Sequence, residues 1–240
     1  MAIWQTRLLM AMMALVLFVV FCVVQIPAAW LVAKYAPNAP FMQVSGNVWA
    51  GQGIWRFGHD KPLTGELEWQ LSLLGAVQGV PFDVQLGQGD SRLTGQAGVS
   101  KTGFAIKALN GRITPSTMQA FGDVYSEMPI VVKNSYIAKD GDKLSADLQA
   151  TIGAGRLFYV YQGQAGETML PMMTASVKND GDSGDGVLLS VVGDTGEFVQ
   201  GGLSVTQVQI GLTQRFMQNF SAYTGQADAD TVVINYAKAW

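Results

Sequence analysis

The chain has 240 residues, a formal net charge of −3 and no run of five or more basic residues. Nucleic-acid binding needs a positive stripe to neutralise phosphates, so this class of partner is excluded. The single cysteine, Cys22, excludes a disulfide within the chain. No glycine or acidic residue occurs up to Ser45, whereas all 28 glycines and all 18 Asp and Glu follow it. An apolar leader thus precedes a Gly-rich, weakly acidic body.

The leader predicts one uncleaved transmembrane helix over residues 8–33. This stretch holds no charged residue, and about 20 apolar residues suffice to cross a bilayer core. Arg7 before it favours a cytoplasmic N-terminus in the cell inner membrane, with the body in the periplasm. The predicted organisation is a cytoplasmic tail (1–7), the span (8–33), a linker (34–43) and a periplasmic β-rich domain (44–240). Residues representative of the anchor are Leu8, Leu15, Val19, Cys22, Val24 and Ile26.

Three alternatives to this anchor are weaker. A cleaved signal peptide usually has an apolar run of only about 7–15 residues, although Ile26-Pro27-Ala28 offers a poor cleavage site. A buried helix of a soluble protein is disfavoured because the stretch has no polar face. Lipidation of Cys22 is possible in principle, but an ordinary apolar residue of the span is the simpler interpretation.

The body alternates apolar and polar residues with period two, which is typical of half-buried antiparallel strands. The alternating segments are Leu63–Leu73, Phe82–Leu86, Leu144–Ile152 and Met173–Lys178, and continuous apolar runs occur at Leu157–Tyr161 and Val187–Val192. Asp-Gly pairs within 139–142 and 179–186, and a further turn at 193–196, supply hairpin turns. The pattern predicts ten to twelve strands joined mainly by hairpins.

Few helices are expected in the body. One is predicted over Ile113–Phe121, with Thr114 as N-cap, Pro115 as first residue and Gly122 as stop. The segment Leu212–Tyr223 fits a helix or a strand equally well. Three repeats of apolar-x-Gly-x-apolar, at 44–48, 93–97 and 109–113, place glycines either at strand ends or at bends within strands. In the second case the sheet would curve into a trough or half-barrel.

The sequence gives no support for catalysis, a metal or a cofactor. His59 is the only histidine and lies in a polar turn. Residues 179–186 have acidic spacing but lack the fifth- and twelfth-position ligands of an EF-hand, which favours a solvated hairpin. Glu66 and Glu68 share one side of a strand, as a carboxylate pair would, but that side is its wet face. We therefore predict a protein that is not an enzyme.

The order of short motifs carries a family resemblance. An uncharged span ending in Ile26-Pro-Ala-Ala-Trp-Leu31 leads into Val44-Ser-Gly-Asn-Val-Trp-Ala-Gly51, followed by Leu67-Glu-Trp-Gln-Leu71 and Leu109-Asn-Gly-Arg-Ile113. In these motifs and in size and layout the chain resembles the type II secretion system protein N family, also called general secretion pathway protein N. The residues expected to have a structural role in the shared motif are Ser45, Gly46, Val48, Trp49, Gly51 and Trp69.

The resemblance implies an accessory inner-membrane subunit of the type II secretion system. Such a subunit would act by protein–protein interaction with other secretion subunits in the export of folded proteins across the outer membrane. It implies no catalytic residue. A remoter similarity in layout to AsmA-like proteins, which pair one membrane anchor with a curved antiparallel sheet, suggests the alternative of a lipid or glycolipid carrier. In that case the side chains of Leu67, Trp69, Leu71 and Phe82 would line an apolar trough and would not fill a closed core. Tyr159 and Tyr161 could also line a trough, although tyrosines in strands more often serve packing alone.

Overall fold

A computed structural model of the chain describes residues 2–35, 37–57, 63–118, 125–161, 163–180 and 186–239. The helices are α1 (Ala2–Val24), α2 (Ala28–Tyr35), α3 (Leu73–Val77), α4 (Pro115–Met118) and α5 (Gln214–Met217). The strands of the first half are β1 (Phe41–Gly46), β2 (Ala50–Phe57), β3 (Leu63–Leu71), β4 (Phe82–Gln88), β5 (Ser91–Val99), β6 (Gly103–Ile113) and β7 (Tyr125–Ser126). Those of the second half are β8 (Ile130–Asp140), β9 (Lys143–Ile152), β10 (Gly155–Tyr161), β11 (Gln164–Leu170), β12 (Met173–Asn179), β13 (Gly186–Val192), β14 (Glu197–Ser204), β15 (Gln207–Thr213) and β16 (Val232–Ala239). The predicted mainly β class is confirmed.

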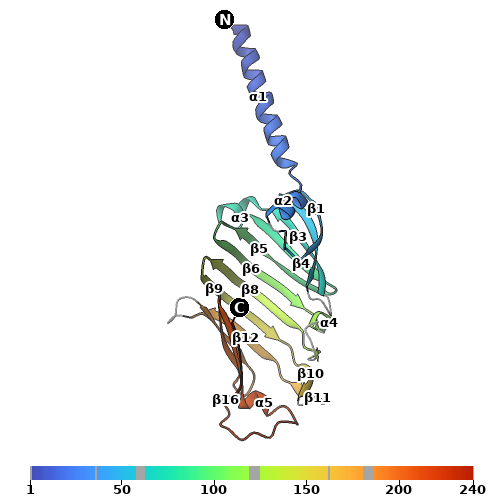
Figure 1. Cartoon of the computed structure of the whole chain (residues 1–240), viewed down its shortest axis with the longest axis vertical. Coiled ribbons are helices and arrows are strands. Elements are labelled where there is room, and N and C mark those ends of the chain that lie inside the picture. Colours follow the sequence, from blue (N-terminus) through green and yellow to red (C-terminus); the bar gives the residue numbers. More distant parts are fainter. Residues whose placement is uncertain are drawn as a thin grey trace.

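Thirteen strands form one antiparallel sheet in the order β1-β2-β3-β4-β5-β6-β8-β9-β12-β13-β14-β15-β16. The strands that this order omits form a second, three-stranded sheet, β11-β10-β7. Figure 1 shows the large sheet twisting along its length, with α1 leaving it at the β1 end and β16 at the other. The prediction of ten to twelve strands was too low, because glycine-containing strands such as β2 and β14 show no clean alternation.

The apolar leader forms two helices instead of one continuous helix over 8–33. The break spans Gln25–Pro27, because proline has no N–H to donate and its ring would collide with the carbonyl group of Val23. Within the part of the chain that the structure describes, no helix is both long and apolar enough to cross a membrane. The predicted linker over 34–43 is shorter in the structure, since α2 continues to Tyr35 and β1 begins at Phe41.

Cross-strand pairing gives the large sheet one polar and one apolar face. Pairing aligns Ser45, Gln52, Glu68, Gln85 and Thr94 in one row across β1 to β5. The adjacent row on the opposite face is Val44, Gly53, Leu67, Leu86 and Leu93. Partners in an antiparallel pair point to the same side of a sheet. The alternation read from the sequence is therefore preserved from strand to strand.

The two clusters of packed, buried side chains lie in the C-terminal half, whereas Trp55, Leu63 and Val80 are buried in the N-terminal half. One cluster consists of Met128, Leu170, Met173 and Phe198, and the other of Tyr159, Met217 and Phe220. The small sheet and α5 supply many of these side chains, so they cover the apolar face of the large sheet at β9 and β12–β16. Neither cluster includes a described residue of β1–β6. The N-terminal half of the sheet is thus one layer thick.

Surface area supports this open architecture. The accessible surface is 15585 Å² for a chain of 25.7 kDa. A compact monomer of this mass exposes only about 10,400 Å². A protruding α1 and a half-covered sheet account for a large surface of this kind. The fold therefore presents much more surface to partners than a closed globule would.

Glycines within the strands make room for aromatic rings on the neighbouring strand. The ring–glycine pairs are Trp69 with Gly51, Trp55 with Gly65, and Tyr159 with Gly166. A Cβ atom added at these glycines would lie 2.4, 2.3 and 2.7 Å from the nearest ring atom, respectively. Such ring-over-glycine pairs stabilise sheets that would otherwise lose packing at glycine. They explain part of the glycine content of the body.

The three glycine repeats divide between turns and bends. Gly46 ends β1 with φ +87°, whereas Gly95 and Gly111 lie inside β5 and β6, where the strand register shifts. Both interpretations of the repeat thus apply, each at different positions. The helix predicted at Ile113 begins at Pro115 as expected, and its predicted stop, Gly122, lies outside the described residues.

Candidate functional site

The motif that carries the family resemblance forms a tight turn between β1 and β2. Asn47 organises this turn: its Oδ1 accepts hydrogen bonds from the backbone N–H groups of Trp49 (3.0 Å) and Ala50 (2.8 Å). The backbone N–H of Asn47 donates to the carbonyl group of Ala50 at 2.9 Å. Gly46 enters the turn with φ +87°, which is accessible to glycine at no steric cost. The turn is therefore encoded by the Gly-Asn pair.

The same turn holds the end of α1. The indole Nε1 of Trp49 donates to the carbonyl group of Val23 at 3.1 Å, and the N–H of Val48 donates to the carbonyl group of Ile26 at 3.1 Å. Carbonyl groups in the last turn of a helix lack intrahelical partners, so the indole satisfies one of them. A bridge between Pro27 and Asn47 completes the contact. We call this arrangement, residues 45–51 against 23–27, the α1 joint.

Trp69 supports the joint from β3. Its ring lies over Gly51, and its Nε1 donates to the carbonyl group of Asn47 at 3.2 Å. The predicted motif residues Ser45, Gly46, Val48, Trp49, Gly51 and Trp69 are thus brought together in one place. Two participants were missed in the sequence, Asn47 and Val23. An asparagine in a Gly-Asn turn is a known signal and could have identified the first.

The predicted anchor residues are distributed along α1 and its end. Leu15, Val19, Cys22 and Val24 are exposed, and Ile26 is half-buried at the α1 joint. Leu8 lies in the first half of α1, where the structure describes the backbone. The described apolar side chains of this helix therefore face outward without packing on the sheet.

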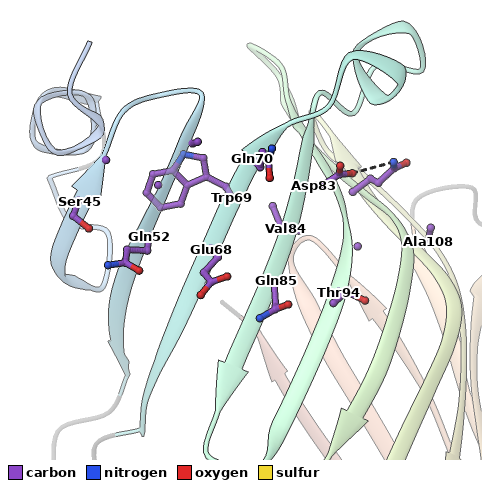
Figure 2. Close-up of a pocket in the computed structure, with 15 residues that line it drawn as sticks. Ser45, Gln52, Glu68, Trp69, Gln70, Asp83, Val84, Gln85, Thr94 and Ala108 are labelled. Carbon is purple, nitrogen blue, oxygen red and sulfur yellow. Dashed lines mark hydrogen bonds between the residues drawn. The ribbon is translucent and has the colours of Figure 1, made fainter. Parts of the chain in front are cut away.

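An open hollow of about 1010 Å³ lies along the polar face of β1–β6. Figure 2 shows Gln52, Glu68, Gln85 and Thr94 projecting from successive strands into it, with Asp83 accepting a hydrogen bond from Gln96 at 3.1 Å. Most of these side chains are neutral amides or hydroxyls, which bind by hydrogen bonding. The hollow therefore offers hydrogen-bonding groups beside the apolar side chains of Trp69 and Val84, and it contains no dense charge.

The candidate catalytic groups do not converge. Glu66 and Glu68 lie on the same face, as predicted, and both are exposed. His59 lies outside the described residues, as does most of the acidic loop at 179–186. Among the residues that the structure describes, no group of three His, Cys, Asp or Glu side chains is placed to hold a metal ion.

One charged pair stands out in the small sheet. The guanidinium group of Arg156 donates to both carboxylate oxygens of Glu127, from Nε at 2.9 Å and from Nη2 at 3.1 Å. This hydrogen bonding, reinforced by the opposite charge of Glu127, raises the pKa of Arg156 above its usual value. Arginine is protonated at all physiological pH values in any case. The ion pair therefore links β10 to the segment after β7, and the charge of Arg156 does not change with physiological pH.

The face of the sheet opposite Gln52, Glu68 and Gln85 is apolar and half-exposed, and Trp69 and Val84 on it also border the hollow. Pairing places Leu67, Trp69 and Leu71 of β3 on this face together with their β4 partners, Leu86, Val84 and Phe82. All six are accessible to some degree, and Leu86 retains 38% of its surface. These side chains therefore do not form a closed core in the described structure.

Comparisons of the chain with protein-family models, with curated proteins and with solved structures returned no match.

Proposed function

We propose that the chain is a non-catalytic, accessory subunit of the type II secretion system that acts by protein–protein interaction. The apolar leader, residues 8–33, would anchor it in the inner membrane through α1, and the sheet would stand in the periplasm. The resemblance of residues 44–51 and 67–71 suggests the system. The open edge of strand β16 is the observation that supports action by protein–protein interaction.

β16 has the properties of a strand that accepts a partner. Within the described residues it pairs only with β15, and its last five residues, 235–239, are exposed. It contains no proline, and its single charge is Lys238. Natural edge strands are usually protected by prolines, charges or bulges. In β16 the register shift lies at Val233, so residues 234–239 keep a regular edge that can add a strand from another protein. A bound extended segment would gain backbone hydrogen bonds along β16.

The anchor is supported by α1 and by the charge pattern of the sequence. Leu15, Phe18 and Phe21 each expose more than half of their surface in the described part of α1. A contiguous apolar surface of this kind is costly in water and is typical of contact with lipid or a partner. The uncharged part of α1, from Leu8 to Val24, is close to the lower limit of about 17 residues that a bilayer core requires.

Crosslinking in cells tests the proposal. A photoreactive amino acid at Tyr236, which is 53% exposed on β16, is expected to capture another secretion subunit. The matched control is the same amino acid at Asp90, in the exposed turn between β4 and β5. The same amino acid at Glu68 tests whether the partner contacts the polar face of the sheet instead of the β16 edge. Two results would contradict the proposal. One is the same crosslinked products from Tyr236 and Asp90, and the other is unchanged amounts of these products in cells that lack the secretion system.

The half-exposed apolar face favours a second candidate, a lipid or glycolipid carrier with an AsmA-like curved sheet. Here Leu67, Leu86 and Leu93 would contact acyl chains. A trough of this kind requires an apolar face without a covering layer, which is the arrangement of β1–β5.

Native mass spectrometry of the full chain, extracted in detergent, distinguishes this candidate. Leu86→Glu is expected to remove any co-purified lipid, because a carboxylate on the apolar face is poorly tolerated beside acyl chains. Gln85→Glu is the control, since it adds the same charge to the opposite face of β4. Absence of lipid from the unmodified chain, or equal lipid in both variants, would exclude the carrier.

A further inference from the structure

Four large apolar side chains project from one end of the large sheet. Leu73, Leu74 and Val77 of α3 retain 80%, 81% and 89% of their surface, and Val99 at the end of β5 retains 81%. Outside α1, these are the highest exposures among the described large apolar side chains. Scattered exposed leucines are ordinary, but four in two adjacent loops form a patch. We call these four residues the α3 rim.

Hydrogen bonds and two buried residues hold the loop that carries the α3 rim. The Oγ of Ser72 accepts a hydrogen bond from the N–H of Gly75 at 3.2 Å and so caps α3. Gly75 and Val80 are buried inside the loop, and Lys107 donates to the carbonyl group of Gln78 at 3.1 Å. Ser72, Gly75 and Val80 thus fix the backbone of the loop through hydrogen bonding and burial. The large apolar side chains of the loop are directed outward.

The α3 rim lies beside the place where α1 leaves the sheet. The N–H of Leu71, two residues before α3, donates to the carbonyl group of Trp49, and the indole of Trp49 donates to Val23 at the end of α1. Gly98 packs on Gly79, since a Cβ atom at Gly98 would lie 2.3 Å from the carbonyl oxygen of Gly79. This contact places Val99 next to α3. Figure 1 shows α2 and α3 at the same end of the sheet, where α1 emerges.

Polarity at this end changes with distance from α1. The loops nearest to α1 carry the α3 rim. The next turns along the same edge are polar: Asp140-Gly-Asp-Lys143 joins β8 to β9, and Ser204 to Gln207 joins β14 to β15. The hydroxyl group of Thr102 donates to the carboxylate of Asp140. Among the described turns at this end, the apolar surface is thus restricted to those that adjoin the apolar helix.

We propose that the α3 rim inserts into the periplasmic leaflet of the bilayer that α1 spans, as a second membrane contact. This inference rests on the anchor of the proposed function. The occupant is lipid because the rim lies at the end of the sheet from which α1, with its exposed apolar surface, emerges. In α2, Trp30 is 53% exposed, and the ammonium group of Lys34 lies 4.7 Å from its ring centroid. Tryptophan and lysine at this position are typical of the membrane–water interface.

Basic residues at the same end suit anionic head groups. Lys34 follows Trp30 on α2, and Lys101 is exposed in the turn that follows Val99. Clusters of this kind strengthen insertion of apolar side chains through attraction to anionic lipid. Contact at two points would fix the tilt of the sheet on the membrane, so that β16 projects away from the surface.

Spin labels on the full chain in nanodiscs of phosphatidylethanolamine and phosphatidylglycerol test this placement. The native Cys22 reports on α1. Leu74→Cys, Val77→Cys and Val99→Cys, each in a Cys22→Ser background, report on the α3 rim. Asp90→Cys, at the opposite end of β4, and Asp142→Cys, farther along the same edge, are the controls. All three rim positions are more than four-fifths exposed, so labels there displace no core contact.

Labels on the rim are expected to have a several-fold higher ratio of oxygen to aqueous nickel-chelate accessibility than labels at Asp90 and Asp142. A label at Cys22 in the bilayer, with rim labels as aqueous as the controls, would overturn this inference alone. An aqueous label at Cys22 would overturn the anchor and the inference together. Repeating the measurement with phosphatidylglycerol omitted is expected to reduce the difference at Val99, next to Lys101, and to leave Cys22 unchanged.

Discussion

Phe198→Ala is expected to lower the free energy of unfolding by about 3–5 kcal/mol, the usual effect of emptying a buried aromatic site. Phe198 is 1% exposed and packs with Met128, Leu170 and Met173 in the first core cluster. Its ring centroid lies 5.7 Å from that of Phe216, which joins α5 to the sheet. The cavity would thus open where the second layer meets the large sheet.

Denaturant unfolding of the full chain in detergent, followed by tryptophan fluorescence, measures this effect. Phe104→Ala is the matched control, because Phe104 lies on β6 and is 42% exposed. Its removal is expected to change the free energy of unfolding by about 1 kcal/mol or less. Similar losses for the two variants would show that the C-terminal half does not contain the main core.

Alternation and turn chemistry predicted much of the fold correctly. The segment from Leu63 has the predicted pattern and forms β3, and the turn at 139–142 joins β8 to β9. Pro115 begins α4 because proline suits the first position of a helix. The ambiguous segment from Leu212 contains both predicted structures, since β15 ends at Thr213 and α5 follows. Local signals were sufficient wherever short-range geometry decides the structure.

Long-range features could not be predicted in the same way. In the three-stranded sheet, β7 and β10 are separated by more than twenty residues, so no local pattern indicates that they pair. Glycines of β2 and β14 resemble turn residues, although their function is to admit rings or close backbones from neighbouring strands. The exposure of the α3 rim could not be predicted either, because it depends on whether other parts of the chain pack against these apolar side chains.

Gly46→Ala is expected to lower the free energy of unfolding by about 2–4 kcal/mol, because two costs add. The φ of +87° is disfavoured for alanine, and the new Cβ atom would lie 2.5 Å from the carbonyl oxygen of Ala50. Both obstacles are backbone features of the α1 joint, which a side-chain rotation cannot relieve. The turn would have to open, and the indole of Trp49 would then lose its contact with Val23.

Gly89→Ala separates the two costs, because Gly89 also has a positive φ, +53°, but has nothing within 4 Å of the added Cβ atom. We expect it to cost only about 1 kcal/mol. Spin-label distances from Cys22 to Asp90→Cys give a second measurement: Gly46→Ala is expected to broaden the distribution because α1 is no longer held on the sheet. Equal stability losses for the two alanine variants, with an unchanged distance distribution, would show that the turn at residues 45–51 does not fix the helix to the sheet.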